Sequence, residues 1–145
     1  MRTAAFLLIF AAGVAGAQKQ PVSGGRVAGQ IAAGAVGVPI GFAAGYILGS
    51  GLRPHGSSNT GVALGFAGAL LGPAAGVNLV GTGGPSHGNF GAAVGGAALG
   101  YGATYIAFPL ARKAPSFGHL KTAATIAALF LPAVGATLAY NATRK

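Results

Sequence analysis

The chain contains no cysteine, no aspartate, no glutamate and no tryptophan, and it has a single methionine. Without cysteine it cannot form a disulfide, a thiolate metal site, a lipoprotein anchor or a cysteine nucleophile. Without a carboxylate side chain it has no group to orient the histidine of a serine-type catalytic triad. Acid–base chemistry would have to rest on histidines, lysines or phenols alone, so we do not expect an enzyme.

Charge is also scarce. Only 6% of the 145 residues are charged, and the nine charged residues are all Lys or Arg. Soluble domains carry about a quarter charged residues, and disordered chains are polar. This chain is 52% hydrophobic, with a mean hydropathy of +0.65. These values favour an integral membrane protein. The basic residues are spread singly over the breaks and ends, which suits lipid headgroups and not a nucleic acid.

The first 17 residues have the pattern of a secretory signal peptide. Arg2 precedes an apolar run, and Ala15-Gly16-Ala17 supplies the small residues of a cleavage site before Gln18. The alternative is an uncleaved first membrane helix, but about 14 apolar residues are short for a hydrocarbon core of about 30 Å. We therefore expect cleavage after Ala17 and a mature N-terminus on the outer side of the membrane.

Four apolar stretches follow, at about 27–52, 60–80, 89–110 and 122–140. Each is close to the roughly 20 residues that a membrane-spanning helix needs. Short breaks rich in turn formers separate them, which makes neighbouring helices antiparallel. The predicted fold is all-α: one helical membrane domain over 18–145, a four-helix bundle of two hairpins. A transmembrane β-barrel is the alternative, but its strands would alternate in polarity, and these runs do not.

Loop charges predict an orientation. With the mature N-terminus outside, the loops that hold Arg53, Arg112 and Lys113 face the cytoplasm, and the middle loop has no Lys or Arg. This agrees with the positive-inside rule, although four basic residues near the termini would lie outside. We expect a bacterial inner membrane with a periplasmic N-terminus. The outer membrane is less favoured, because helical bundles are rare there.

Small residues recur at every fourth position. The row in the first stretch consists of Gly25, Gly29, Ala33, Gly37, Gly41, Gly45 and Gly49. Residues at i and i+4 share one side of a helix, so such a row lets another helix backbone come close. Later rows include Gly61, Gly65, Gly68, Gly72 and Gly76, and then Gly96 and Gly100. We predict that these glycines form helix contacts, within the monomer or between copies. The fourth stretch has one glycine and is expected to face lipid more.

A few polar or irregular residues interrupt the apolar stretches. Gln30 and Asn78 are predicted to form hydrogen bonds between helices. Each stretch has a proline in it or at its end, which implies a kink whose freed carbonyl needs a partner. These prolines are Pro39, Pro73, Pro109 and Pro132.

Two patterns resemble catalytic or metal-binding motifs. Residues 84–88 match G-x-S-x-G, but a nucleophile elbow needs a strand–turn–helix setting and a carboxylate-supported histidine. We interpret Ser86 as a loop residue. His55, His87 and His119 are too few on one predicted side of the membrane for a metal site. No metal and no cofactor are expected.

The small-residue rows, the signal peptide and the short loops together resemble the glycine-zipper membrane proteins of bacterial cell envelopes. The resemblance rests on Gly37, Gly41, Gly45 and Gly49. It implies glycine-zipper packing of helices and, as in some of those proteins, assembly into oligomers. It implies no particular activity. This chain departs from the pattern by lacking a lipoprotein cysteine and by having more than two spans.

The leading hypothesis is a small multi-pass membrane protein with a structural or assembly role in the bacterial envelope. Its expected partners are the lipid bilayer, further copies of itself and other membrane proteins. An oligomeric passive channel or permeability-altering protein is one alternative. A secreted, cationic, glycine-rich membrane-active protein is another.

Overall fold

The computed structural model describes residues 22–51, 58–83, 86–112 and 118–145. Within these ranges the chain forms four helices and no strand: α2 (Gly24–Gly51), α3 (Ser58–Gly81), α4 (Phe90–Arg112) and α5 (Gly118–Ala142). The prediction of an all-helical chain with four helices is confirmed, and every helix end lies within four residues of its predicted place. The predicted signal peptide, residues 1–17, lies outside the described residues.

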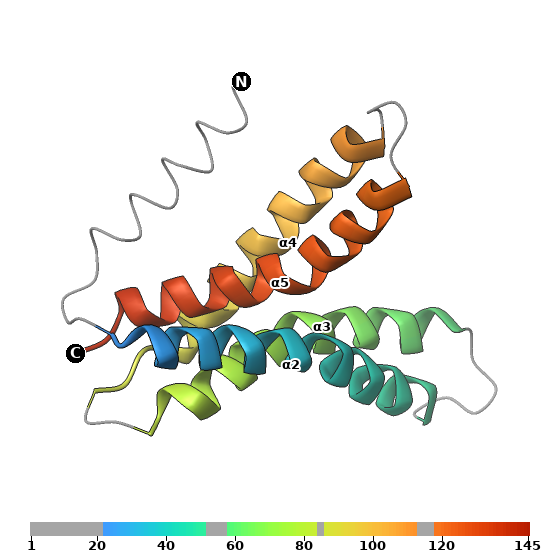
Figure 1. Cartoon of the computed structure of the whole chain (residues 1–145). Helices are drawn as coiled ribbons and strands as arrows, with labels where there is room; N and C mark the ends of the chain where they lie inside the picture. Colours follow the sequence, from blue (N-terminus) through green and yellow to red (C-terminus); the bar gives the residue numbers. More distant parts are fainter. Residues whose placement is uncertain (1–21, 52–57, 84–85, 113–117) are drawn as a thin grey trace.

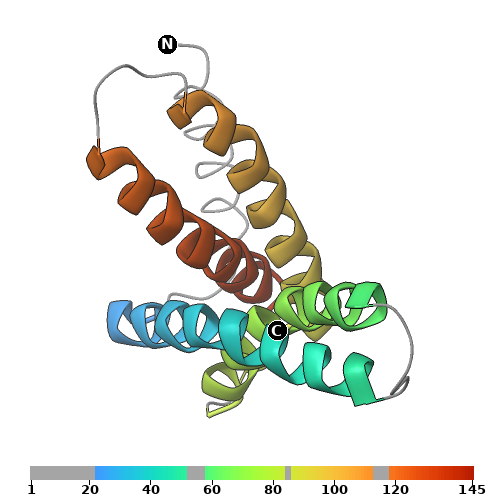
Figure 2. The same cartoon turned by 90° about the vertical axis from the view of Figure 1, so that its right-hand side faces the viewer.

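The helices pack as two antiparallel hairpins, α2 with α3 and α4 with α5 (Figure 1). The hairpins meet where the start of α2 lies beside the end of α5, and they diverge toward their other ends (Figures 1 and 2). The most extensive contact is between α2 and α3, and the second is between α4 and α5. Each hairpin is therefore a tighter unit than the pair of hairpins.

The expectation that the fourth stretch faces lipid more than the others is wrong for its C-terminal half. Helix α5 contacts α2, α3 and α4, and most of its residues from 131 to 141 are buried. The expectation counted glycines, whereas the buried face of α5 also uses Ala133 and Ala136, which are 0% exposed. An alanine methyl is small enough for close helix packing, so one glycine suffices there.

Small side chains form the interior of the molecule, and large ones form its outside. The buried apolar residues are mostly alanines: Ala69, Ala74, Ala93, Ala97, Ala133 and Ala136, joined by Val77 and Tyr140. By contrast, Ile40, Ile47, Leu48, Phe66 and Leu79 on α2 and α3 are each more than 60% exposed. Burial of apolar area contributes only about 0.8 kcal/mol per CH₂ group, so an alanine interior gains little from leaving water.

Each helix contains one of the predicted prolines. In α3, a side chain of a neighbouring helix satisfies the carbonyl that the proline leaves without a donor. Pro73 has no N–H, so it cannot donate to the carbonyl of Ala69 one turn earlier. The hydroxyl of Tyr101, from α4, donates to that carbonyl at 3.0 Å. The kink in α3 is thus tied to α4, which helps to hold the second hairpin against the first.

Candidate functional site

The contact between α2 and α3 is lined by glycines from both helices. A Cβ added at Gly37 would overlap the carbonyl oxygen of Gly72, and one at Gly72 would overlap that of Gly37. Gly41 and Gly68 form a second pair of the same kind. In both pairs a Cα–H therefore points at the facing carbonyl oxygen, a weak hydrogen bond worth about 0.5–1 kcal/mol. These two helices touch through their backbones.

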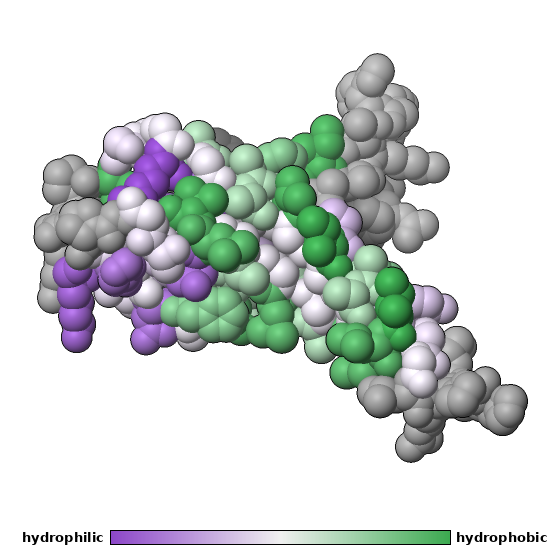
Figure 3. All heavy atoms as spheres, turned by 90° about the horizontal axis from the view of Figure 1, so that it is seen from below, coloured by the Kyte–Doolittle hydropathy of each residue, from purple (hydrophilic) through white to green (hydrophobic). Residues whose placement is uncertain are grey.

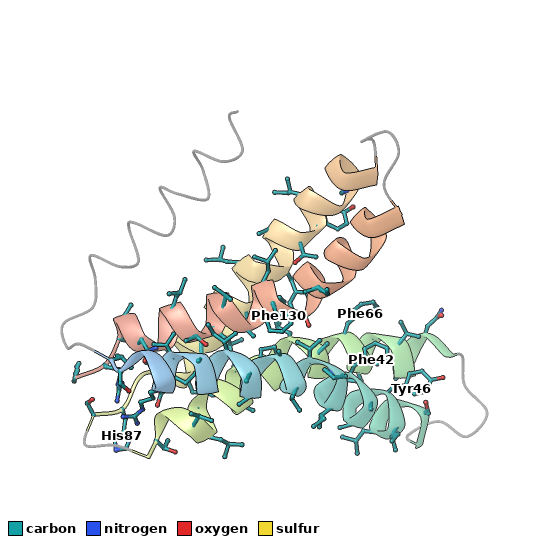
Figure 4. All side chains as sticks on the ribbon, in the orientation of Figure 1. Phe42, Tyr46, Phe66, His87 and Phe130 are labelled. Atoms are coloured by element: carbon teal, nitrogen blue, oxygen red, sulfur yellow. The ribbon has the colours of Figure 1, made fainter. Side chains whose placement is uncertain are left out.

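The other predicted glycines of this hairpin extend the same contact. Gly45 lies against the carbonyl of Leu64, Gly49 against the backbone of Gly61, Gly76 against the carbonyl of Ala33, and Gly29 against Val80. Gly61 and Gly65 lie under the rings of Tyr46 and Phe42. Those rings stack on each other with centroids 6.2 Å apart, and Phe66 meets Phe42 edge-on (Figure 4).

The α4–α5 hairpin repeats this arrangement with fewer glycines. Gly96 and Gly135 face each other's carbonyl oxygens, and Gly100 lies against the carbonyl of Leu131. Gly25 is different, because a Cβ there would meet no atom within 4 Å. It precedes the point where α2 and α3 come together, so among the described residues it makes no helix contact, and a contact of Gly25 with another copy stays a prediction.

An apolar groove of about 910 Å³ runs along the outer side of the α2–α3 contact. Its floor includes Gly37, Gly41, Gly68 and Gly72, and its walls are large side chains at helical spacing. The wall residues are Val36, Ile40, Leu48, Leu64, Leu71 and Leu79. Figure 3 shows this face of the molecule, on which pale small residues lie between strongly apolar ones. The groove is an extended apolar surface that the rest of the described chain leaves open.

A cluster of polar side chains is buried where the two hairpins meet. The side-chain amide of Asn141, on α5, donates from Nδ2 to Oε1 of Gln30, on α2, at 2.7 Å. Gln30 and Thr137 are 0% exposed, and Asn141 is 2% exposed. Four buried side-chain atoms have no partner among the described residues: Gln30 Nε2, Thr137 Oγ1, Tyr140 OH and Asn141 Oδ1. A buried polar atom without a hydrogen bond costs about 1–3 kcal/mol, so these atoms call for a ligand or water.

Two arginines lie one turn beyond this cluster, and both hold the α3–α4 connection. Arg26 donates from its guanidinium to the carbonyl of Gly81, the last residue of α3, at 2.5 Å. Arg144, only 5% exposed, donates from Nη2 and Nε to the carbonyl of Ser86 at 2.8 and 3.3 Å. The connection is fixed further by Asn89, whose N–H donates to Thr143 Oγ1 at 2.8 Å and whose Oδ1 accepts from Ala92 N–H.

Ser86 and His87, two residues of the G-x-S-x-G match, lie in this connection. Ser86 is buried and its carbonyl binds Arg144, while His87 is exposed at the end of the molecule (Figure 4). The first two residues of the G-x-S-x-G match, 84 and 85, lie outside the described residues, as does His55. The side chain of His119 also lies outside them.

Among the residues that the structure describes, one of the two predicted hydrogen-bonding residues forms an interhelical bond. Gln30 bonds across the hairpins, whereas the hydrogen bond that the structure gives Asn78 uses its backbone carbonyl, which accepts from Thr82 N–H. Sequence reasoning missed Thr137, Asn141 and Arg144. Their spacing was the available signal, because residues 137 and 141 share one face of a helix, as do 26 and 30, and 144 follows three residues later.

Comparison with protein-family models, with curated proteins and with solved structures finds no match.

Proposed function

We propose that this chain is a multi-pass helical membrane protein of a bacterial envelope with a structural or assembly role. The observation that carries the proposal is the inverted distribution of side chains in the α2–α3 hairpin, with glycine and alanine inside and Ile, Leu and Phe outside. In water this arrangement would expose the large apolar groups and gain little from its core. In lipid it is favourable, because close backbone contact holds the helices together and the large side chains meet acyl chains.

The lengths of the helices support a spanning arrangement. Among the described residues, two helices are long and apolar enough to cross a membrane: α2, with 28 residues, and the 23 residues of α3 from Asn59 to Gly81. Only 11% and 28% of their apolar windows are buried, unlike a core helix of a soluble protein. Helices α4 and α5 have 23 and 25 residues, enough for about 30 Å at 1.5 Å per residue.

Membrane insertion is tested by introducing single cysteines, since the natural chain has none. We expect Ile47→Cys and Leu71→Cys, exposed on the outer faces of α2 and α3, to resist a water-soluble maleimide in membranes and to react after detergent is added. Thr82→Cys, exposed at the α3–α4 connection, is the matched control and should react from one side without detergent. Equal reactivity of all three in intact membranes would contradict the proposal, as would release of the protein by a carbonate wash.

The assembly role rests on the groove along α2 and α3. Its glycine floor would let a helix of another copy, or of another membrane protein, approach as closely as α2 approaches α3. Ala44 lines the groove and is exposed, and it lies outside the glycine pairs that join the two helices. We expect Ala44→Leu to fill the groove and leave the hairpin intact.

The corresponding measurement is the oligomer distribution in mild detergent, by cross-linking and light scattering. The wild type should form oligomers, and Ala44→Leu should shift them toward monomer with unchanged helix content. Ala98→Leu adds the same volume at an exposed position on α4, outside the groove, and should assemble as the wild type does. A monomeric wild type, or equal effects of the two variants, would reject the groove as the assembly surface.

A further inference from the structure

The sequence offers no carboxylate side chain to pair with the buried guanidinium of Arg144. A buried cation is ordinarily paired with an anion, because removing a charge from water is costly. The sequence contains no Asp or Glu, and the contacts that the structure gives Arg144 are with the carbonyl of Ser86. A carbonyl oxygen orients the guanidinium but does not neutralise it. An anion that neutralises this charge has to come from a group other than the side chains of this sequence.

A second cation lies beside it. Arg26 precedes Gln30 by one turn on the same face of α2. Arg144 follows Asn141 by three residues, just beyond the end of α5. Because Gln30 and Asn141 are hydrogen-bonded to each other, the two arginines leave that pair in the same direction, toward the α3–α4 connection. Both donate to carbonyls of this connection, at Gly81 and Ser86. Each guanidinium has five N–H donors, and these carbonyls use only part of them.

The buried cluster below the arginines supplies an independent sign of a ligand. Three donors have no partner among the described residues: Gln30 Nε2, Thr137 Oγ1 and Tyr140 OH. One acceptor, Asn141 Oδ1, also has no partner there. Thr137, Tyr140 and Asn141 all lie within about one turn of α5. Tyr140 OH also lies close to Gly81, since a Cβ at Gly81 would be 2.6 Å from it. One of the unsatisfied donors, the Tyr140 hydroxyl, therefore lies near Gly81, whose carbonyl Arg26 binds.

We propose that this end of the molecule binds a phosphate group between Arg26 and Arg144, at the α3–α4 connection. Two guanidiniums with neighbouring neutral donors match the charge and the several acceptor oxygens of a phosphate. Gln30 and Tyr140 complete the site from below, directly or through a water. The phosphate belongs either to an anionic lipid headgroup or to a soluble phosphate ester. Only the lipid source rests on the membrane location proposed above.

The experiment compares thermal unfolding of the wild type with two phosphate probes. One arm uses nanodiscs of phosphatidylcholine with increasing phosphatidylglycerol, in a buffer without phosphate. The other uses the protein in neutral detergent with glycerol 3-phosphate. A saturable rise in Tm in the first arm alone indicates a lipid headgroup, and a rise in the second indicates that a soluble ester suffices. No saturable rise in either arm overturns the proposal.

Variants separate the site from general attraction between a basic protein and an anion. Arg144→Gln and Arg26→Gln should each weaken the apparent affinity by about tenfold or more, the scale of a lost charge-assisted contact. Lys145→Gln removes the same charge from an exposed position and should bind as the wild type does. Equal losses in all three variants would show nonspecific attraction and reject the site.

Two further measurements keep the test decisive. Arg144→Lys retains the charge but loses the pair of hydrogen bonds to the Ser86 carbonyl, so it should bind phosphate more weakly than the wild type. Circular dichroism checks that the variant folds. If Arg144→Gln does not fold, the proposal is still tested by Arg144→Lys, by Arg26→Gln and by the two experiments on the wild type. Recovery of the protein outside the membrane fraction, with glycerol 3-phosphate binding intact, would reject the proposed function and leave the phosphate site standing.

Discussion

Tyr101 donates a hydrogen bond to the carbonyl of Ala69 that Pro73 leaves without its helical donor. The bond is 3.0 Å long and joins α4 to the kink in α3. A proline inside a helix leaves the carbonyl one turn earlier without its N–H donor, and here the replacement donor comes from the other hairpin. The proline and the tyrosine therefore act as a pair, although 28 positions separate them in the sequence.

We expect Tyr101→Phe to destabilise the fold by about 0.6–1.7 kcal/mol, the range measured for interhelical hydrogen bonds in membranes. In a Pro73→Ala background the same change should cost less, because the substituted alanine has an N–H that can donate to the carbonyl of Ala69. A double-mutant cycle of unfolding in mixed micelles measures the difference. Additive effects of the two substitutions would contradict the pairing.

A second prediction concerns the glycine pair of Gly41 and Gly68. A Cβ at Gly41 would overlap the Gly68 carbonyl oxygen, and the backbone cannot move aside without separating the helices. We expect Gly41→Ala to cost about 1–3 kcal/mol, as overpacking does elsewhere, and Gly41→Leu to prevent the hairpin from forming. Unfolding in mixed micelles and protease resistance give the readout.

Gly95→Ala is the matched control for that change. Gly95 is also helical, but a Cβ there would meet no atom within 4 Å. The substitution should therefore stabilise the protein by about 0.5–1 kcal/mol, the difference in helix propensity between the two residues. If both Gly41→Ala and Gly95→Ala changed the free energy of unfolding in the same direction, close backbone contact would not explain which glycines the fold requires.

Gly88 allows a third prediction, in the α3–α4 connection. A Cβ at this position would overlap the backbone carbonyl of Tyr140 and lie 2.7 Å from its ring. Gly88→Ala should displace the connection from α5 and lower the Tm. Among the described residues, a Cβ at Gly83, in the same connection, would meet only the Val80 carbonyl, at 3.9 Å. Gly83→Ala is therefore the control and should change the free energy of unfolding by less than about 0.5 kcal/mol. A tolerated Gly88→Ala would show that Tyr140 does not hold the connection in place.

The sequence predicted the helices well because their signals are local. Unbroken apolar stretches, turn-rich breaks and short connections are enough to indicate four helices and antiparallel neighbours. The row of Gly37, Gly41, Gly45 and Gly49 also indicated which side of α2 is smooth. The residues of α3 that this row contacts were not evident, because spacing within one helix says nothing about the register of another.

The contacts within the polar cluster also could not be predicted from local sequence patterns. Gln30 could be selected as a polar residue within an apolar stretch, but its bond to Asn141 spans 111 residues. That bond depends on how the two hairpins dock, which no local pattern specifies. Asn78 carried an equally strong local signal, and its described hydrogen bond is a backbone one. Residue type indicates that a polar group needs a partner, and only tertiary packing selects the partner.

The bond between Gln30 and Asn141 supports a last prediction, on how the hairpins dock. Gln30→Leu leaves the buried Nδ2 of Asn141 without its acceptor, so we expect a loss of about 1–3 kcal/mol. Asn141→Leu should cost a similar amount, because it leaves the buried Oε1 of Gln30 without its donor. The double variant removes both polar groups together and should be more stable than either single one, because no orphaned donor or acceptor of that pair remains. Unfolding in mixed micelles tests this, with cross-linking between single cysteines on α2 and α5 to follow docking. A double variant that loses the sum of the two single effects would show that the two amides act independently.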